Sequence, residues 1–336
     1  MTMALGRYLP VALINPDTTS GETTEEFADF RRTCLPVQGD AATLNLGDWR
    51  TSSHLPGRTV ISYVAWETSR IPKPHLNILK QTDHIWVPSH WQKDIFIRNG
   101  LHEDRVQVVP EGFDPRIYYP PETKLPRGHT FRFLFVGKWE VRKGITELLA
   151  AFTREFSPDE PVELMLAAHN PFRRDFDTET ALQHTLRELG ASGHRIRNLP
   201  AMSHIKLADI YRSVDAFVLP TRAEGWGLSL LEAMACGLPC IVTGYSGLTE
   251  FATADCTYHL RRGIRLEPVN DSVFYKPDFN WGRWARPNIR HLRRLMRRVY
   301  KNPAEAQSIG QNAARIVHSH WTWDHAARKA LQYLPV

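Results

Sequence analysis

The sequence predicts an α/β protein built around doubly wound parallel sheets. Short apolar runs rich in β-branched residues alternate with longer amphipathic segments, which is the pattern of parallel strands joined by crossover helices. The alternation is most regular between residues 131 and 243, and a chain of 336 residues is too long for one small core. We therefore expect two globular domains, with ligands bound beyond the carboxyl ends of the strands.

The first third of the chain has this pattern with irregular spacing. Strands are predicted at residues 8–14, 59–65, 84–87 and 106–109, and helices near 22–33, 74–81 and 90–99. Residues 114–129 read DPRIYYPPETKLPRGH, where four prolines and a glycine interrupt any periodicity. This segment is the predicted linker.

The regular part after the linker alternates strand and helix throughout. Strands are predicted at 131–136, 162–168, 195–199, 216–219 and 240–243, and helices at 146–156, 179–189, 204–213 and 228–236. Three more helices are expected at 288–300, 303–318 and 323–333.

Composition excludes several classes of protein. The net charge of +6, from 32 Arg and 10 Lys against 36 acidic residues, is mild for this length. No apolar run approaches the roughly 18 residues of a membrane span, and the start, MTMALGRYLPVALINPD, lacks the features of a secretory signal. Cys34, Cys236, Cys240 and Cys256 are scattered and are interpreted as reduced thiols. We therefore expect a cytoplasmic protein.

A cationic turn follows the strand at 131–136. Its sequence, GKWEVRKG at residues 137–144, places Lys138, Arg142 and Lys143 just before a helix. Cations are unfavourable at a helix N-terminus, by about 0.3–1 kcal/mol each, so an anion between them would explain the pattern. The alternative is a solvated basic turn balanced locally by Glu140 and Glu147.

Two glutamates form the sharper signal. Glu224 follows the strand at 216–219, beside Gly225 and Gly227, which allow the backbone to approach a ligand closely. Glu232 falls on the next helix, on a largely apolar face. Burying such a carboxylate alone costs several kcal/mol, so it must be paired, hydrogen-bonded or bound to a ligand. The alternative places Glu232 at the solvent edge of the helix.

The segment EGWGLSLLEAMACGLPC resembles the E-x7-E signature of the retaining GT-B glycosyltransferases, the glycosyltransferase family 4-like group also described as glycosyl transferases group 1. Other segments resemble motifs of that family in the same order. VPEGFDP is similar to its P-N-G-V-D turn, GKWEVRKG to its G-R-x4-K-G phosphate turn, IVTGYSGLTEF to its G-G-x-x-E segment and HSHWTWDHAARKAL to its terminal F-S-W helix. The resemblance covers about residues 84–336.

The resemblance implies a GT-B architecture. Residues 1–120 would form a short acceptor-binding Rossmann-like domain, residues 121–302 a nucleotide-sugar-binding one, and residues 303–336 helices that pack back toward the first domain. The implied reaction is retaining transfer of a hexose (EC 2.4) from a UDP- or GDP-linked sugar to a hydroxyl of a glycan, glycolipid precursor or small molecule. No metal or other cofactor is implied, and no Asp-x-Asp pair stands at the end of a predicted strand.

Roles carry over residue by residue. Donor binding is implied for Gly137, Lys138, Arg142, Lys143, Glu224, Gly225, Trp226, Gly227, Leu228, Ser229 and Glu232. Lys138 and Lys143 would hold the diphosphate and stabilise it as a leaving group. Glu224 would contact hydroxyls of the transferred sugar and Glu232 the ribose, while backbone N–H groups of residues 226–229 would face the sugar and phosphates.

This sequence departs from the family pattern at two places. Glu111 stands where the junction turn usually has Asn, and the phosphate turn is one residue shorter than in some relatives, which leaves the assignment among Lys138, Arg142 and Lys143 open. The N-terminal half is short and lacks the family's glycine-rich loop, so the acceptor is the least readable feature.

The strand at 59–65 runs into Trp66 and Glu67, where many relatives carry a histidine near the reacting carbon. We hypothesise that Glu67 is catalytic and orients or deprotonates the acceptor hydroxyl. The alternative is a strand-end glutamate paired with Arg70. Other histidines could serve as well, among them His54, His75, His84 and His90, and the polar loop at 15–24 could bind a sugar or be a plain loop.

An arginine-rich helix is predicted near residues 290–298. Its cationic face could contact the inner face of a membrane or a nucleic acid, or could be a plain solvated face. Two alternative functions stay open. One is glycosyl transfer to a modified base in nucleic acid, and the other is a non-catalytic protein that binds nucleotide or glycan.

Overall fold

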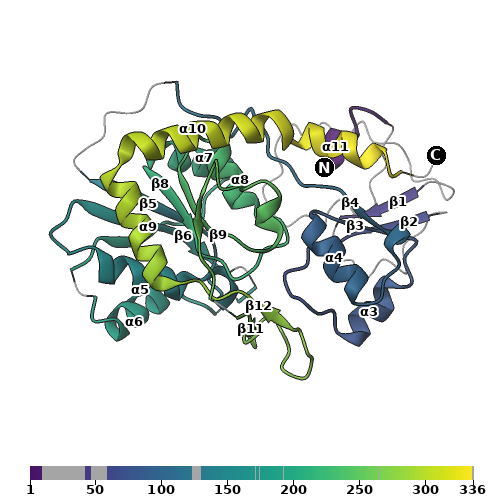
Figure 1. Ribbon diagram of the computed structural model, residues 1–336, viewed down its shortest axis with the longest axis horizontal. Helices are drawn as coiled ribbons and strands as arrows, with labels where there is room; N and C mark the ends of the chain where they lie inside the picture. Colours follow the sequence, from purple (N-terminus) through teal and green to yellow (C-terminus); the bar gives the residue numbers. More distant parts are fainter. Residues whose placement is uncertain are drawn as a thin grey trace. The chain divides into compact units, whose positions relative to one another are not determined.

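The structure is a computed structural model that describes residues 1–9, 42–46, 59–122 and 130–334, except 171, 174, 192 and 264. The chain divides into two compact units (Figure 1). The first unit comprises Met1–Trp66, Ile71–Gly112 and His320–Val336, and the second Glu67–Arg70 and Phe113–Ser319. Several predicted features lie outside the described residues: the helix at 22–33, the loop at 15–24, Cys34 and His54.

The first unit is built on a parallel sheet in the order β1-β2-β3-β4. Its strands are β1 (Ala42–Asn45), β2 (Thr59–Tyr63), β3 (His84–Val87) and β4 (Val106–Val108). Its helices are α1 (Thr2–Leu5), α3 (Lys73–Leu79), α4 (His90–Arg98), the 3-10 turn η3 (Glu103–Arg105) and α11 (Trp323–Leu331). Helices α3 and α4 supply the crossovers that parallel neighbours need.

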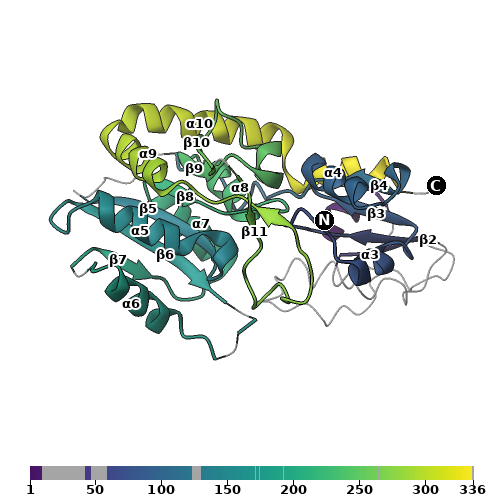
Figure 2. The same cartoon turned by 60° about the horizontal axis from the view of Figure 1, so that its bottom comes forward.

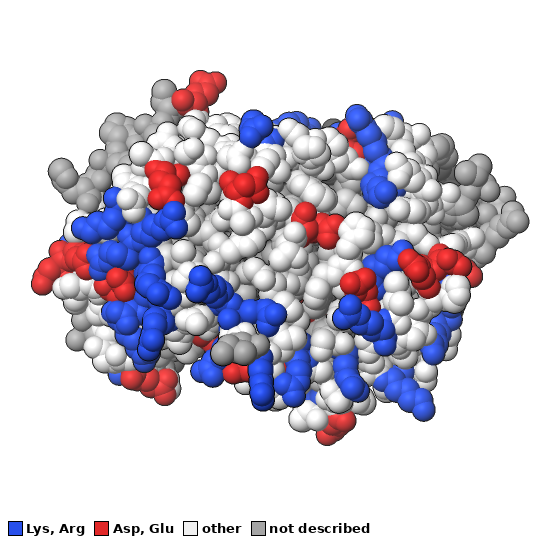
Figure 3. All heavy atoms as spheres, in the orientation of Figure 1, with Lys and Arg blue, Asp and Glu red and all other residues white. Residues whose placement is uncertain are grey.

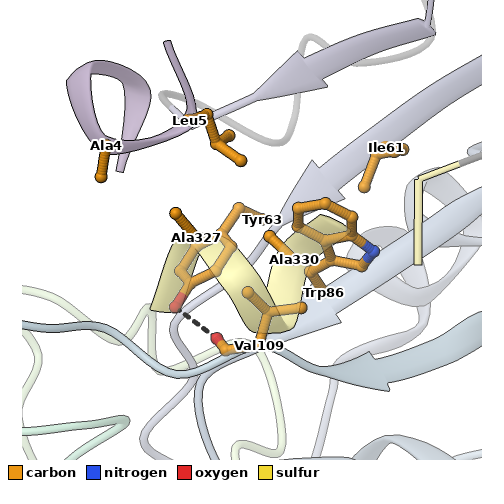
Figure 4. Packing of buried hydrophobic residues seen from close by; sticks show 8 residues of the cluster. All are labelled: Ala4, Leu5, Ile61, Tyr63, Trp86, Val109, Ala327 and Ala330. Atoms are coloured by element: carbon orange, nitrogen blue, oxygen red, sulfur yellow. Dashed lines mark hydrogen bonds between the residues drawn. The ribbon is translucent and has the colours of Figure 1, made fainter. Parts of the chain in front are cut away.

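The core of the first unit joins the two ends of the chain. Leu5 of α1, Tyr63 of β2 and Trp86 of β3 pack against Ala327 and Ala330 of α11 (Figure 4). The Tyr63 hydroxyl donates to the Val109 carbonyl over 2.8 Å, so this buried polar group is satisfied. The prediction that the C-terminal end of the chain packs on the first domain is confirmed for α11.

The second unit has a six-stranded parallel sheet in the order β10-β9-β8-β5-β6-β7. Its strands are β5 (Phe131–Lys138), β6 (Val162–His169), β7 (Ile196–Asn198), β8 (Ala216–Leu219), β9 (Cys240–Thr243) and β10 (Tyr258–Leu260). Every residue of β8 and β9 is buried, as expected for central parallel strands covered on both faces. Figure 2 shows the sheet from below, with helices on either side.

The helices of the second unit follow its strands. They are α5 (Ile145–Glu155), α6 (Thr178–Glu188), α7 (His204–Ser213), α8 (Leu228–Ala235), α9 (Ile289–Lys301) and α10 (Pro303–His320). Helix α9 lies along α5, and His318 of α10 is 3.1 Å from the Ala235 carbonyl at the end of α8 (Figure 1). The 3-10 turns η4 (Val141–Lys143) and η5 (Ser246–Glu250) lie beyond the carboxyl ends of β5 and β9.

The predicted α/β fold class is confirmed, and each strand and helix predicted after residue 130 is present within a few residues of its predicted bounds. The strand predicted at 8–14 is wrong at Tyr8 and Leu9, because both amides donate to the Leu5 carbonyl in a turn that continues α1. Residues 10–14 lie outside the described residues. The sequence also did not predict β1, β10 and the two-residue strands β11 (Glu267–Pro268) and β12 (Arg283–Trp284).

Candidate functional site

The predicted donor residues meet where the strand order of the second unit reverses. Strand β5 pairs with β6 on one side and β8 on the other, so the connections leave in opposite directions from this point. The backbone turns that follow β5 and β8 therefore meet at one end of the sheet, which is the usual ligand position in such sheets. The cationic turn follows β5, and Glu224 follows β8.

Backbone packing fixes the cationic turn against β8. Gly144 ends η4 with φ +70° and begins α5. A Cβ at this position would lie 2.0 Å from the Pro220 carbonyl oxygen, so glycine is required both for the backbone conformation and for the close approach. The Arg222 amide also donates to the Arg142 carbonyl over 2.7 Å. The two loops thus form one rigid frame.

Arg142 is the buried centre of this frame, with 5% of its surface exposed. One guanidinium nitrogen donates to Glu224 over 2.8 Å and to the Ala223 carbonyl over 2.9 Å, and the other donates to Glu140 over 2.5 Å. Three carboxylates raise the pKa of Arg142 well above its usual value, even though burial alone would lower it. Its hydrogen bonds face the protein, and it fixes the carboxylates around it.

Glu224 is itself buried, with 4% of its surface exposed. Lys143 Nζ and the Thr221 hydroxyl donate to Oε1, each over 2.8 Å, and Arg142 donates to Oε2. Burial raises the pKa of Glu224, but Arg142, Lys143 and the hydrogen bonds outweigh that effect and bring it to about 2. Glu224 is therefore ionised at neutral pH and accepts hydrogen bonds at the edge of the site.

The backbone around Glu224 is held from η5. Its amide donates to the Ser246 hydroxyl over 2.8 Å, and the Gly247 amide donates to the Glu224 carbonyl over 3.0 Å. Ser246 adopts φ +68°, which is strained for a non-glycine residue. The sequence reasoning missed Ser246, although it stands at the first glycine position of the G-G-x-x-E motif, which was the available signal.

Lys138 lies at the end of β5 in different surroundings. Its Nζ is 4.4 Å from the centre of the Phe172 ring, and it forms no ion pair within the described part of the chain. Burial lowers its pKa. Of the three cations in the turn, Lys138 and Lys143 therefore present amino groups at the site, whereas Arg142 is enclosed.

The loop from Gly225 to Ser229 leads into α8. Gly227 caps the helix with φ +104°, and a Cβ there would lie 2.3 Å from Leu248 Cδ2. Trp226 is buried, with its ring 4.9 Å from that of Phe251. Leu228 and Ser229 form the first turn of α8, so this N-terminus follows β8 at the carboxyl end of the sheet.

Glu232 is half-buried one turn further along α8. The Tyr211 hydroxyl donates to it over 3.2 Å, and Tyr118 lies within hydrogen-bonding reach. Burial raises its pKa to about 7, and the two tyrosines oppose that rise in part. Both tyrosines were missed by the sequence reasoning, because they come from residues 21 and 114 positions earlier in the chain.

Glu67 lies in the second unit and faces the cationic turn. Its Oε1 is 3.5 Å from Arg142 Nη2, and the Tyr275 hydroxyl donates to Oε2 over 3.4 Å. The other predicted candidates, Trp66, His75, His84 and His90, belong to the first unit. Tyr275 was not predicted, since its loop carries no regular pattern.

Glu140 and Glu147, the acidic residues predicted to balance the cationic turn, pair with two different arginines. Glu140 pairs with Arg142, but Glu147 pairs with Arg222, which also contacts Glu267 at 3.1 Å. The positive charges of Lys138, Arg142 and Lys143 thus face the negative charges of Glu67, Glu140 and Glu224. The plain solvated turn is wrong for Arg142, because that side chain and its partner Glu140 are buried.

The arginine-rich helix is α9, and its cations are partly neutralised. Arg293 and Arg297 pair with Glu155, Arg297 also pairs with Glu160, and Arg298 pairs with Glu305. Arg290 and Arg294 are exposed. Figure 3 shows Lys and Arg side chains gathered over the region of α9 and toward β12.

Cys236, Cys240 and Cys256 are free and buried, and burial raises the pKa of Cys236 to about 12. Among the described residues, no three His, Cys, Asp or Glu side chains are placed to hold a metal ion. Nor does any helix in that part of the chain have the length and apolar character to cross a membrane.

Comparison with known proteins gives consistent relatives. Residues 130–271 match the model of the family described as glycosyl transferases group 1. D-inositol 3-phosphate glycosyltransferase of Pseudarthrobacter chlorophenolicus is 30% identical over 179 residues, which are 50% of this chain and 40% of that protein. The chain spans about two fifths of the length of the curated relatives it matches first.

Two solved structures share the fold. Sucrose-phosphate synthase from Thermosynechococcus elongatus is 22% identical with a TM-score of 0.64, covering 84% of this chain and 69% of that one. Anabaena HepE in complex with UDP and glucose is 15% identical with a TM-score of 0.66, covering 82% and 71%. The predicted GT-B fold is confirmed.

Proposed function

We propose, on the premise that residues 130–271 belong to the glycosyl transferases group 1 family, that the protein is a retaining hexosyltransferase with a nucleoside diphosphate sugar as its donor. The observation that carries the proposal is Glu224: a buried, ionised carboxylate held by Arg142 and Lys143 beside two helix N-termini. Stability alone does not call for such an arrangement, because apolar side chains would pack there at lower cost.

The geometry supports the donor roles that the family resemblance implies. Lys138 and Lys143 bind the diphosphate together with the N-terminal turns of α5 and α8, whose partial positive charge favours anions. Glu224 accepts hydrogen bonds from hydroxyls of the sugar, and Glu232 accepts them from the ribose. Arg142 is a positioning residue, because its guanidinium is already enclosed by protein acceptors.

The chemical burden of the reaction is charge separation. As the bond between sugar and phosphate breaks, negative charge grows on the diphosphate and positive charge on the sugar ring. Fixed cations stabilise the first and the Glu224 carboxylate the second, and neither needs to reorganise during the reaction. Glu67 orients the acceptor hydroxyl from beside Arg142, at 3.5 Å from its guanidinium.

The relatives support a nucleotide-sugar donor, since HepE was solved with UDP and glucose. We assign donor binding to the second unit and acceptor binding to the first. The acceptor is a hydroxyl of a glycan, lipid-linked or small molecule, and both UDP- and GDP-linked sugars are kept as donors.

A thermal-shift screen across nucleotide sugars tests the proposal. A donor at 100 times its dissociation constant stabilises a protein by about 2.7 kcal/mol, which is a clear shift in Tm. Slow release of nucleoside diphosphate from the bound donor separates an enzyme from a non-catalytic binding protein. If no nucleotide sugar shifts the Tm, the proposal is wrong.

A second candidate concerns the acceptor. Exposed Arg290 and Arg294 lie near Arg261 and Arg262, because the Asn288 amide donates to the Arg261 carbonyl and Arg262 pairs with Pro287. This basic surface favours an anionic partner, either the inner face of a membrane or a nucleic acid that carries the acceptor base. Binding to anionic vesicles and to RNA or DNA, measured as salt rises, tests the two; phosphate contacts with nucleic acid weaken steeply with salt.

A further inference from the structure

A projecting segment between β10 and α9 has no role in the proposed donor site. We call residues 266–284 the arm. Its base is the antiparallel pair β11 and β12, extended by the Val269 amide, which donates to the Gly282 carbonyl over 3.1 Å. The base is joined to the Glu224 loop, because Arg222 pairs with Glu267 at 3.1 Å and accepts a backbone hydrogen bond from Ala285.

The arm holds the chain segment that carries Glu67. The Arg70 amide donates to the Trp281 carbonyl over 3.1 Å, and the Arg283 amide donates to the Ser69 hydroxyl over 2.8 Å. Between these two bonds stands Gly282, where a Cβ would lie 2.3 Å from Ser69 Oγ. Residues 67–70 group with the second unit for this reason, although Trp66 and Ile71 belong to the first.

One side chain of the arm reaches the reaction centre. The Tyr275 hydroxyl donates to Glu67 Oε2 over 3.4 Å. Its ring is fixed edge-on by Trp281 and by the fully buried Trp284, with centroid distances of 5.2 and 5.7 Å. Tyr275 therefore holds Glu67 from one side while Arg142 holds it from the other.

We propose that the arm is a positioning element for the transfer step and that Tyr275 is its positioning residue. The inference rests on the proposed function. Tyr275 and Arg142 together fix the carboxylate of Glu67, and Arg142 also binds Glu224. The arm thereby sets the distance between the carboxylate that orients the acceptor and the carboxylate that contacts the donor sugar. Such a residue affects turnover more than donor binding.

The test uses the full chain with Tyr275→Phe, Glu67→Gln and the double variant. Release of UDP or GDP from UDP-glucose and GDP-mannose measures turnover, and calorimetry with UDP or GDP alone measures binding. Tyr275→Phe is expected to lower kcat about three- to tenfold, with the nucleotide Kd within twofold. The double variant is expected to be no slower than Glu67→Gln. Lys276→Ala, on the exposed face of the arm, is the matched control and should match the wild type.

A second measurement tests the contact between the arm and residues 67–70 and does not depend on enzyme activity. Hydrogen exchange in a peptide spanning residues 66–71 should accelerate in Gly282→Ala and stay unchanged in Lys276→Ala. Three results would overturn the inference. The first is that the losses in kcat from Tyr275→Phe and Glu67→Gln multiply in the double variant, and the second is that Tyr275→Phe changes the nucleotide Kd as much as it changes kcat. The third is unchanged hydrogen exchange in Gly282→Ala. If the wild type neither binds nor hydrolyses either donor, the proposed function fails and the positioning role fails with it. Accelerated exchange in Gly282→Ala would then still show that the arm holds residues 67–70 in place.

Discussion

Glu224 and Glu232 stand eight positions apart, yet their surroundings drive their pKa values in opposite directions. Glu224 has a pKa of about 2 because two cations and a hydroxyl surround it, whereas Glu232 has a pKa of about 7 because its neighbours are neutral tyrosines. Burial acts on both in the same sense. The difference shows that partner charge, and not depth, decides whether a buried carboxylate stays ionised.

Removing a cation from Glu224 should have the largest effect. Lys143→Ala is expected to lower turnover about 10²–10³-fold, because Lys143 supports Glu224 and, in the proposed function, stabilises the leaving diphosphate. Release of nucleoside diphosphate from the donor measures this. Lys143→Arg is the matched control. A Lys143→Ala enzyme with wild-type rates would show that the site is assigned wrongly.

Arg142→Met should affect the fold as well as the chemistry. The substitution leaves Glu140 and Glu224 buried without their shared counter-ion, which costs about 3–5 kcal/mol of unfolding free energy. Urea denaturation measures it. Substituting exposed Arg294 by Met is the comparison and should change the free energy by less than about 0.5 kcal/mol. Equal losses in the two variants would contradict the central role of Arg142.

Glu232 should make donor binding depend on pH near neutrality. With a pKa of about 7 its ionised, hydrogen-bond-accepting form dominates at pH 8 and is the minority at pH 6. UDP or GDP affinity, whichever nucleotide binds, should therefore fall about tenfold between these values and stay flat in Glu232→Gln. Calorimetry at the two pH values measures the affinity. If the affinity of Glu232→Gln changed with pH as steeply as that of the wild type, Glu232 would not belong to the proposed ribose site.

Stability should respond to the same group in the opposite sense. The folded-state pKa of Glu232 is raised from 4.5 to about 7, so the folded state binds more protons and its contribution to stability is lost as pH rises through 7. The limit is about 3 kcal/mol at high pH. Glu232→Gln should be more stable than the wild type at pH 8 and similar at pH 5, as judged by Tm.

The smallest effect is expected from Tyr211→Phe. Its hydroxyl stabilises the ionised form of Glu232, so its removal should raise the pKa of that carboxyl further. The pH midpoint of nucleotide binding should move upward accordingly. Tyr300→Phe on α9 serves as the control, and a midpoint that moves downward would reverse the assigned role of the tyrosine.

The sequence allowed the second unit to be predicted well because its strands are buried on both faces. Apolar runs such as AFVL in β8 and CIVT in β9 are typical of strands that are buried on both faces of a sheet. Both strands match the prediction residue for residue. Strand β1 was missed because ATLN is short and half polar. The arm was missed because it owes its shape to contacts with distant residues such as Ser69.

The candidate site divides in the same way. Lys138, Lys143 and Glu224 were predicted from local motifs, and they lie at or beyond the carboxyl ends of the neighbouring strands β5 and β8. The environment of Glu232 could not be predicted, because Tyr118 and Tyr211 reach it through the fold and not through any spacing in the sequence. The enclosure of Arg142 likewise depends on the meeting of two loops about 80 positions apart.

The packing of α11 in the core of the first unit has a consequence for folding during synthesis on the ribosome. Ala327 and Ala330 complete a core that otherwise comes from residues before 110. The second unit, Glu67–Arg70 and Phe113–Ser319, has all its residues translated before that core can close. The N-terminal segment of the nascent chain therefore stays incompletely packed until α11 has been translated, so the first unit can be completed only after the second.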